Sequence, residues 1–314
     1  MGLVGEPVTV RVPATSANLG PGFDALGLAL TLYDEVEARV AGDGTTVEVL
    51  GEGAGELPAG ESHLVVRAMR LAFEQLGEDP GGLALRCNNR IPQARGLGSS
   101  SAAIVAGIVL ARGLVDSGAE RLDDAAALRL AARIEGHPDN VAPCLLGGLT
   151  IAWTEESGAR AVRLDAAPEV RPFVFVPEER GLTEAARAAL PPAVPHTDAA
   201  FNAGRAALLV QALTRDPVHL FAATEDRLHQ QYRAAAMPGS ARLLSLLREQ
   251  GVAGVISGAG PSVLALATGN WTPPPVPGWR VWPLDVDAVG ASAGLSWDGV
   301  RLNTPSGTLL PLDR

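Results

Sequence analysis

Residues 93–106 have the composition of a segment that holds a phosphate group. Their sequence, QARGLGSSSAAIVA, places two glycines ahead of three serines and then continues as small and apolar residues typical of a helix. Glycine lets the backbone approach a bulky anion, and a helix starting at the serines would direct unpaired N–H groups and a positive dipole end at one point. The segment therefore predicts a phosphate-binding loop; the alternative is a flexible surface loop.

This loop does not fit the common nucleotide-binding motifs. The chain contains no lysine, which excludes a Walker-type Gly-Lys-Ser/Thr loop. A dinucleotide fingerprint needs a third glycine where Ser101 stands, and the Gly-x-Ser-x-Gly elbow of hydrolases is not matched. A cradle of main-chain amides and serine hydroxyls remains, one of which could bind Mg²⁺.

Three further segments combine glycine or proline with polar side chains. They are PATSANLGPGFD at residues 13–24, EGHPDNVAP at residues 135–143 and ISGAGPS at residues 256–262. The first follows an expected strand, the second ends an expected helix, and the third lies between two expected strands. Each is a candidate for a site-forming loop.

The elements that must position these loops follow from hydrophobic periodicity. The expected strands are 8–12, 26–40, 46–50, 83–91, 147–153, 173–176, 252–256 and 263–267. The expected helices are 63–76, 100–115, one capped by Asp123, 139–146, 183–190, 198–213, helices within 217–232, and 240–250. The fold class is therefore α+β, and a change of pattern near residues 162–168 divides the chain into domains 1–164 and 165–314.

Composition narrows the classes of partner. Hydrophobic residues make up 47% of the 314 residues, enough to fill a core, and the net charge of −10 disfavours nucleic acid. Cys87 and Cys144 are too few for a disulfide framework. The first twelve residues do not resemble a signal peptide, and the apolar run 102–111 is too short to cross a bilayer. We expect a cytoplasmic protein without nucleic-acid or membrane partners.

In combination, residues 13–24, 96–102 and 256–262 resemble the three signature motifs of the GHMP small-molecule kinases, in the family's order and spacing. With residues 135–143, they resemble the homoserine kinases within that family. The resemblance implies an N-terminal α/β domain with a left-handed β-α-β crossover, a C-terminal ferredoxin-like domain and an active site between them. It also implies a homodimer that uses ATP and Mg²⁺ to phosphorylate L-homoserine to O-phospho-L-homoserine, in threonine biosynthesis, by direct in-line transfer.

For the nucleotide, the resemblance implies that the glycine-serine loop wraps the triphosphate and that Ser100 and Glu135 hold Mg²⁺. His63 stands where homologues often carry asparagine near the adenine, and an imidazole could stack on or hydrogen-bond to a purine. The implied ATP-binding residues are Gln93, Ala94, Arg95, Gly96, Leu97, Gly98, Ser99, Ser100, Ser101, Ala102 and His63.

For the acceptor, a zwitterion needs an anion for its ammonium and a fork of donors for its carboxylate. Asp24 can face the ammonium, and the family's two carboxylate-binding arginines fall at Arg187 and Arg233. The implied substrate-binding residues are Asn18, Asp24, Asn140, Arg187, Arg233 and Gly260, and the implied catalytic residues are Asp24, Asn140, Glu135 and Ser100.

No general base stands out. Asp24 could accept the hydroxyl proton but would serve better as a counterion, and His137, at a helix turn, has the position of a structural histidine. His196, His219 and His229 lack metal-ligand spacing and are read as ordinary. We therefore predict substrate alignment by Asp24 and Asn140 without strong base catalysis, which suits a dissociative phosphoryl transfer.

Two alternatives stay open. One is another GHMP kinase that acts on mevalonate, a sugar or a related alcohol; paired arginines beside an acidic group favour an amino acid instead. The other is a catalytically inactive nucleotide-binding regulator of the same fold, which the presence of Ser100, Glu135, Asp24 and Asn140 together disfavours.

Overall fold

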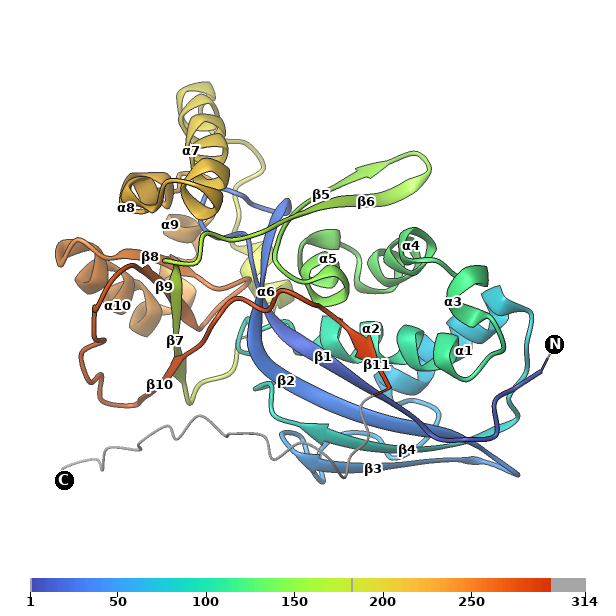
Figure 1. The fold of residues 1–314 in the computed structure, drawn as a ribbon. Helices are drawn as coiled ribbons and strands as arrows, with labels where there is room; N and C mark the ends of the chain where they lie inside the picture. The colour runs from blue at the N-terminus through green and yellow to red at the C-terminus, as the bar shows by residue number, and fades with distance from the viewer. Residues whose placement is uncertain (1, 182, 295–314) are drawn as a thin grey trace.

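Two β-sheets, each packed against helices, organise the chain in the computed structural model, which describes residues 2–181 and 183–294 (Figure 1). The larger sheet has the order β11-β1-β2-β4-β3, with β5 paired to β2 and β6 to β5, and the smaller has the order β10-β7-β9-β8. The predicted α+β class is confirmed. The strands of the larger sheet are β1 (Val8–Ala17), β2 (Leu26–Ala41), β3 (Thr45–Gly51), β4 (Gly82–Asn89), β5 (Leu149–Glu155), β6 (Gly158–Leu164) and β11 (Ser292–Ala293).

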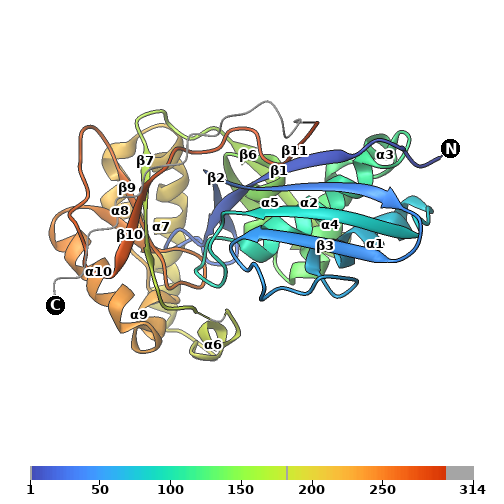
Figure 2. The same ribbon diagram turned by 90° about the horizontal axis from the view of Figure 1, so that it is seen from below.

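Helices cover one face of the larger sheet, and Figure 2, seen from below, shows the strands in front of them. Helix α2, which carries the serines at its start, is small and apolar along its length and is buried over most of it. The predicted helix boundaries are largely confirmed because the signals are local: Gly77 ends α1 in the left-handed conformation, and the Asp123 side chain caps α4. These helices are α1 (Leu64–Leu76), α2 (Ser99–Gly113), α3 (Gly118–Arg121), α4 (Asp124–Glu135) and α5 (Pro138–Leu146).

The pairing of β3 with β4 is parallel, whereas the other pairs of this sheet are antiparallel. Since α1 connects β3 to β4, the three elements form a β-α-β unit. The handedness of this crossover stays a prediction.

The smaller sheet is antiparallel. Read across the sheet, its strands are the fourth, first, third and second of the four in the sequence. A ferredoxin-like β-α-β-β-α-β unit has a helix in both crossovers. Here helices occupy the first crossover, while residues 268–278 before β10 form a loop whose three consecutive prolines are incompatible with a helix interior. The elements are β7 (Arg171–Pro177), α6 (Thr183–Ala188), α7 (His196–Thr214), α8 (Leu220–Ala223), α9 (Gln230–Arg233), α10 (Pro238–Glu249), β8 (Ala253–Ile256), β9 (Val263–Ala267) and β10 (Trp279–Pro283).

Several features differ from the sequence prediction, which did not include α3 or β6. Strand β1 continues to Ala17, so the following loop is shorter than residues 13–24 suggest. The region 217–232 is broken into short helical turns that leave room for the turn at Asp226. After β10 the chain returns to the larger sheet, where β11 pairs with β1 and the Tyr33 hydroxyl donates to Asp287 Oδ2 at 2.7 Å.

The boundary between domains 1–164 and 165–314 stays a prediction, since the second range supplies this returning strand to the first sheet and its residues 295–314 lie outside the described residues. Within the described ranges, no helix is long and apolar enough to cross a membrane.

The contact between α1 and α2 depends on a glycine. A β-carbon at Gly107 would collide with the Val65 carbonyl oxygen, whereas a β-carbon at Gly204 in α7 would meet nothing within 4 Å. We expect Gly107→Ala to destabilise the protein by about 1–3 kcal/mol through overpacking, despite the better helix propensity of alanine. Gly204→Ala, the matched control, should stabilise it by about 0.5–1 kcal/mol. Urea denaturation measures both; equal effects of the two variants would contradict this packing.

Candidate active site

Two cavities meet at the start of α2. The first, of about 350 Å³, lies beside α1 and the larger sheet, and the second, of about 260 Å³, lies between the two sheets. Ala94, Ser99 and Ser100 line both, so the glycine-serine loop is the wall that the cavities share. The second cavity is lined by Asn18, Asp24, Ala94, Gly96, Gly98, Ser99, Ser100, Glu135, His137, Asp139, Asn140, Gly181, Arg187, Arg233, Gly258 and Ala259.

The shared wall presents backbone donors. Gly98 precedes α2 with a φ of 71°, and the first helical hydrogen bond runs from Ala102 N to Gly98 O at 2.8 Å. The amides of residues 99–101 therefore have no partner within the helix. At Gly98 a β-carbon would collide with the Thr15 hydroxyl, so glycine is required for this close approach. The arrangement is that of an anion site at a helix N-terminus.

Ser100 and Glu135 lie together at this wall. Both the Ser100 and the Ser101 hydroxyls donate to Glu135 Oε1, at 2.6 and 2.8 Å. No group of three or more His, Cys, Asp or Glu among the described residues could hold a metal by itself. One carboxylate and one hydroxyl fit Mg²⁺, which completes its octahedron with phosphate oxygens and water.

The first cavity offers polar groups on mostly apolar walls. The His63 side chain is 3% exposed, both of its ring nitrogens lack a hydrogen-bond partner, and burial lowers its pKa. Burial also raises the pKa of Asp34 to about 7, although the amides of Arg90 and Ile91 donate to its Oδ1. A neutral imidazole and a carboxyl group in the same cavity suit a heterocycle that carries both donors and acceptors.

The second cavity is charged. Arg187 binds Asp24 through two hydrogen bonds, from Nη1 to Oδ2 at 3.1 Å and from Nη2 to Oδ1 at 2.8 Å, and this contact raises the pKa of Arg187. Arg233 is 2% exposed, and no aspartate or glutamate of the described residues forms an ion pair with it. A buried guanidinium without a carboxylate partner is costly. The cavity can therefore accept a carboxylate.

The two predicted asparagines have different surroundings. Asn140 Oδ1 accepts from the Thr15 hydroxyl at 2.9 Å, which leaves its amide NH₂ for the cavity. Asn18 bridges two segments, since its Oδ1 accepts from Asp24 N and its Nδ2 donates to Gly258 O, both at 2.9 Å. Thr15 was missed by the sequence analysis, which placed it in a loop rather than on a buried strand.

Four predicted site residues, Arg95, Leu97, Ser101 and Gly260, line neither cavity. The Arg95 guanidinium donates to the carbonyl oxygens of Pro177, Glu178 and Gln93 and lines neither cavity. Gly260 does not line the second cavity, and a β-carbon there would meet the Met237 side chain; its role in substrate binding stays a prediction. Gly258 and Ala259, two and one residues earlier in the same turn, line the second cavity instead. In addition, Leu97 and Ser101 are buried.

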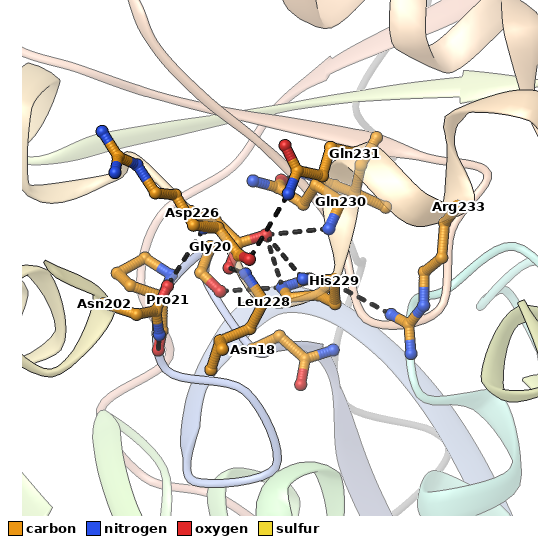
Figure 3. A network of polar contacts seen from close by, with 12 residues as sticks. Asn18, Gly20, Pro21, Asn202, Asp226, Leu228, His229, Gln230, Gln231 and Arg233 are labelled. Carbon is orange, nitrogen blue, oxygen red and sulfur yellow. Dashed lines mark hydrogen bonds and ion pairs between the residues drawn. The ribbon is translucent and has the colours of Figure 1, made fainter. Parts of the chain in front are cut away.

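Two histidines contribute in different ways. His137 Nδ1 lies 2.5 Å from Asp139 Oδ1 at the start of α5, and this hydrogen bond raises the pKa of His137. His229, expected to be ordinary, is fully buried and contacts both Gly20 O and Arg233 Nη1 (Figure 3). The sequence does not mark His229 as part of the site, because its contact with Gly20 O joins residues that are 209 positions apart.

A glycine-serine anion site at a helix start, joined to a charged cavity, is typical of a small-molecule phosphotransferase. The model of the GHMP kinases N terminal domain matches residues 63–148, and that of the GHMP kinases C terminal matches residues 199–271. The chain belongs to the GHMP kinase family.

Relatives within the family are similar over most of the chain. The homoserine kinase of Streptomyces coelicolor is 57% identical over 97% of this chain and 95% of its own length, and that of Mycobacterium tuberculosis is 50% identical over 87% of each. The crystal structure of homoserine kinase from Cytophaga hutchinsonii superimposes with a TM-score of 0.81 at 26% identity, covering 93% of this chain and 99% of that one. Mevalonate-3-kinase from Thermoplasma acidophilum, at 14% identity and a TM-score of 0.60, shares the fold.

The His137–Asp139 contact predicts a pH-dependent contribution to stability. Because the folded-state pKa of His137 is raised, its contribution is fully present below the ordinary histidine value of about 6.5 and disappears as pH rises through the folded-state value. His137→Gln should therefore lower the free energy of unfolding most in mildly acidic buffer and least in alkaline buffer. Urea denaturation across this range measures it. In an Asp139→Asn background the pH trend should vanish; its persistence there would contradict the assignment.

Proposed function

We propose that the protein is an ATP-dependent homoserine kinase that transfers the γ-phosphoryl group to the hydroxyl of L-homoserine. The observation that carries the proposal is the second cavity, in which Asp24 and two arginines lie across from the start of α2. Similarity to homoserine kinases over nearly the whole chain supports it. A cytoplasmic homodimer acting in threonine biosynthesis is part of the same proposal.

The nucleotide side uses the first cavity and the shared wall. The purine would occupy the apolar cavity beside His63, whose unpartnered nitrogens can donate and accept. The triphosphate would lie along the loop, where the amides of residues 99–101 replace the lysine that the chain lacks. Ser100 and Glu135 would hold Mg²⁺, which supplies neutralisation of charge on the phosphates.

The acceptor side uses the charged cavity. Asp24 would take the ammonium group, and Arg187 and Arg233 the carboxylate. The zwitterion would use the same donor and acceptor atoms as the Asp24–Arg187 ion pair. Binding would therefore replace that pair by two, one between Asp24 and the ammonium and one between Arg187 and the carboxylate. The amide NH₂ of Asn140, oriented by Thr15, is placed to hydrogen-bond the reacting hydroxyl.

This arrangement favours alignment over base catalysis. Asp24 accepts two hydrogen bonds from Arg187, so its carboxylate oxygens are already engaged as the partners of a cation. The Nδ1 atom of His137 is engaged in the hydrogen bond with Asp139. In a loose phosphoryl transfer the hydroxyl proton is lost late, so positioning and neutralisation supply most of the rate.

A panel of acceptors tests the proposed reaction. Release of ADP by the purified protein should be rapid with L-homoserine and near background with mevalonate, galactose or glycerol. Mevalonate has a carboxylate but lacks the ammonium that Asp24 would bind, and galactose and glycerol lack both charged groups. Turnover of mevalonate or a sugar without turnover of homoserine would overturn the proposal, and ATP binding without any turnover would favour a regulator.

Asp24→Asn tests the role of the carboxylate. We expect the KM for L-homoserine to rise at least tenfold, because a charge-assisted hydrogen bond to the ammonium is lost, while kcat stays within about threefold. Steady-state kinetics at saturating ATP separates the two parameters. A collapse of kcat with an unchanged KM would assign Asp24 the role of a base instead.

A further inference from the structure

His229 occupies a buried position between two parts of the acceptor site. It precedes α9, is 0% exposed, and packs against the Phe23 ring with centroids 5.1 Å apart. Its Nε2 lies 2.8 Å from Gly20 O, in the loop that carries Asn18 and Asp24. Its Nδ1 lies 3.1 Å from Arg233 Nη1, one helical turn further along (Figure 3).

The two partners fix the tautomer of the ring. A carbonyl oxygen only accepts hydrogen bonds, so the proton must be on Nε2; a guanidinium only donates, so Nδ1 must be the acceptor. The imidazole that satisfies both contacts is neutral. Burial, the largest influence, lowers the pKa of His229, which agrees with this geometry.

Asp226 holds the turn in which the histidine sits. Its carboxylate, buried with the ring, accepts from the amides of Leu228, His229 and Gln230. Its Oδ2 also lies 3.6 Å from His229 Nε2, on the side away from Arg233. The charged groups that act on the ring are therefore Asp226, Arg233 and, at longer range, Asp24.

The hydrogen bonds of Arg233 explain why its orientation matters. Its Nε donates to Ala186 O at 3.0 Å, and its Nη1 donates to His229 and, at 3.4 Å, to Gly258 O. No hydrogen bond from Nη2 joins it to a described residue, so this edge of the fork is free for a ligand. Asp24 and Asp226 both attract Arg233 without touching it. A neutral acceptor at Nδ1 holds the guanidinium without neutralising it.

We propose that His229 is a positioning residue for the acceptor carboxylate: as the neutral Nε2–H tautomer it joins Gly20 O to Arg233 and keeps the guanidinium directed into the cavity. This inference rests on the proposed homoserine kinase activity and refines it. An apolar side chain at this position would leave Nη1 of Arg233 with only its longer contact to Gly258 O and allow the guanidinium to turn toward Asp226. A protonated ring would lose the same acceptor and place a second positive charge beside the first.

The test compares His229→Leu, which removes both contacts, with His229→Asn, whose side-chain oxygen can replace the Nδ1 acceptor. His219→Leu is the matched control, because His219 is half-exposed and its side chain contacts Asp216 at the surface. Each variant is assayed for ADP release with L-homoserine and ATP varied separately, and its thermal midpoint is recorded.

For His229→Leu we expect the KM for L-homoserine to rise about tenfold or more, with the KM for ATP within twofold of wild type and kcat within about threefold. His229→Asn should recover much of the KM, and His219→Leu should match wild type. In wild type, the KM for L-homoserine should rise as the buffer becomes acidic enough to protonate His229. This rise of KM at acidic pH should be absent from His229→Leu.

An unchanged KM for L-homoserine in His229→Leu would overturn the inference. Equal losses in His229→Leu and His229→Asn, in parallel with lowered thermal midpoints and a raised KM for ATP, would show a structural role only and would also overturn it. Wild type that fails to phosphorylate L-homoserine contradicts the proposed function instead, so the two failures are distinguishable.

Discussion

The candidate active site depends on the close approach of two glycine-rich turns from different halves of the chain. The Ser257 hydroxyl lies 2.7 Å from Gly96 O, and the amide of Gly258 donates to Ala17 O at 3.1 Å. A β-carbon at Gly96 would collide with the Ser257 carbonyl oxygen. This contact fixes the start of α2 relative to Gly258, whose carbonyl oxygen binds both Asn18 and Arg233. Both cavities therefore derive their relative placement from it.

The two cavities differ in the groups that they offer to negative charge. The chain is acidic and has no lysine, so in the proposed function main-chain amides and a divalent cation would neutralise the triphosphate in place of a side-chain ammonium. The side-chain cations of the cavity, Arg187 and Arg233, lie instead on the acceptor side. One is paired with Asp24 and the other has a neutral histidine beside it. The cavity can thus present opposite charges to a zwitterion without cancelling them all internally.

Local features of the fold were predictable because short-range chemistry decides them. Proline at the start of α5, glycine after α1 and the Asp123 cap each act within one helical turn. Features that depend on distant partners were not. Strand β11 returns to β1 across the whole chain, and Thr15 becomes a site residue only because Asn140, 125 residues later, folds against it.

The same distinction applies to the site. The glycine-serine loop carries its signal in its own sequence, and most of the predicted residues around it line one or both cavities. A turn of several small residues does not reveal from its sequence which one faces the cavity, and here Gly258 and Ala259 line it while Gly260 does not. The surroundings of His229 come from the first loop and from Arg233, so spacing alone gave no indication of them.

The backbone of the first loop shows why those long-range contacts are needed. Asn18, Leu19 and Asp24 have φ values of 68°, 50° and 55°, in the left-handed region that non-glycine residues avoid. Each such residue costs on the order of 1–3 kcal/mol and persists only where the surroundings impose it. Leu19 is fully buried, Asn18 ties Asp24 N to Gly258, and His229 binds the carbonyl oxygen of Gly20 in the same turn. The strained conformation places the Asp24 carboxylate beside Arg187, so the network that holds Arg233 also holds the opposite charge of the acceptor site.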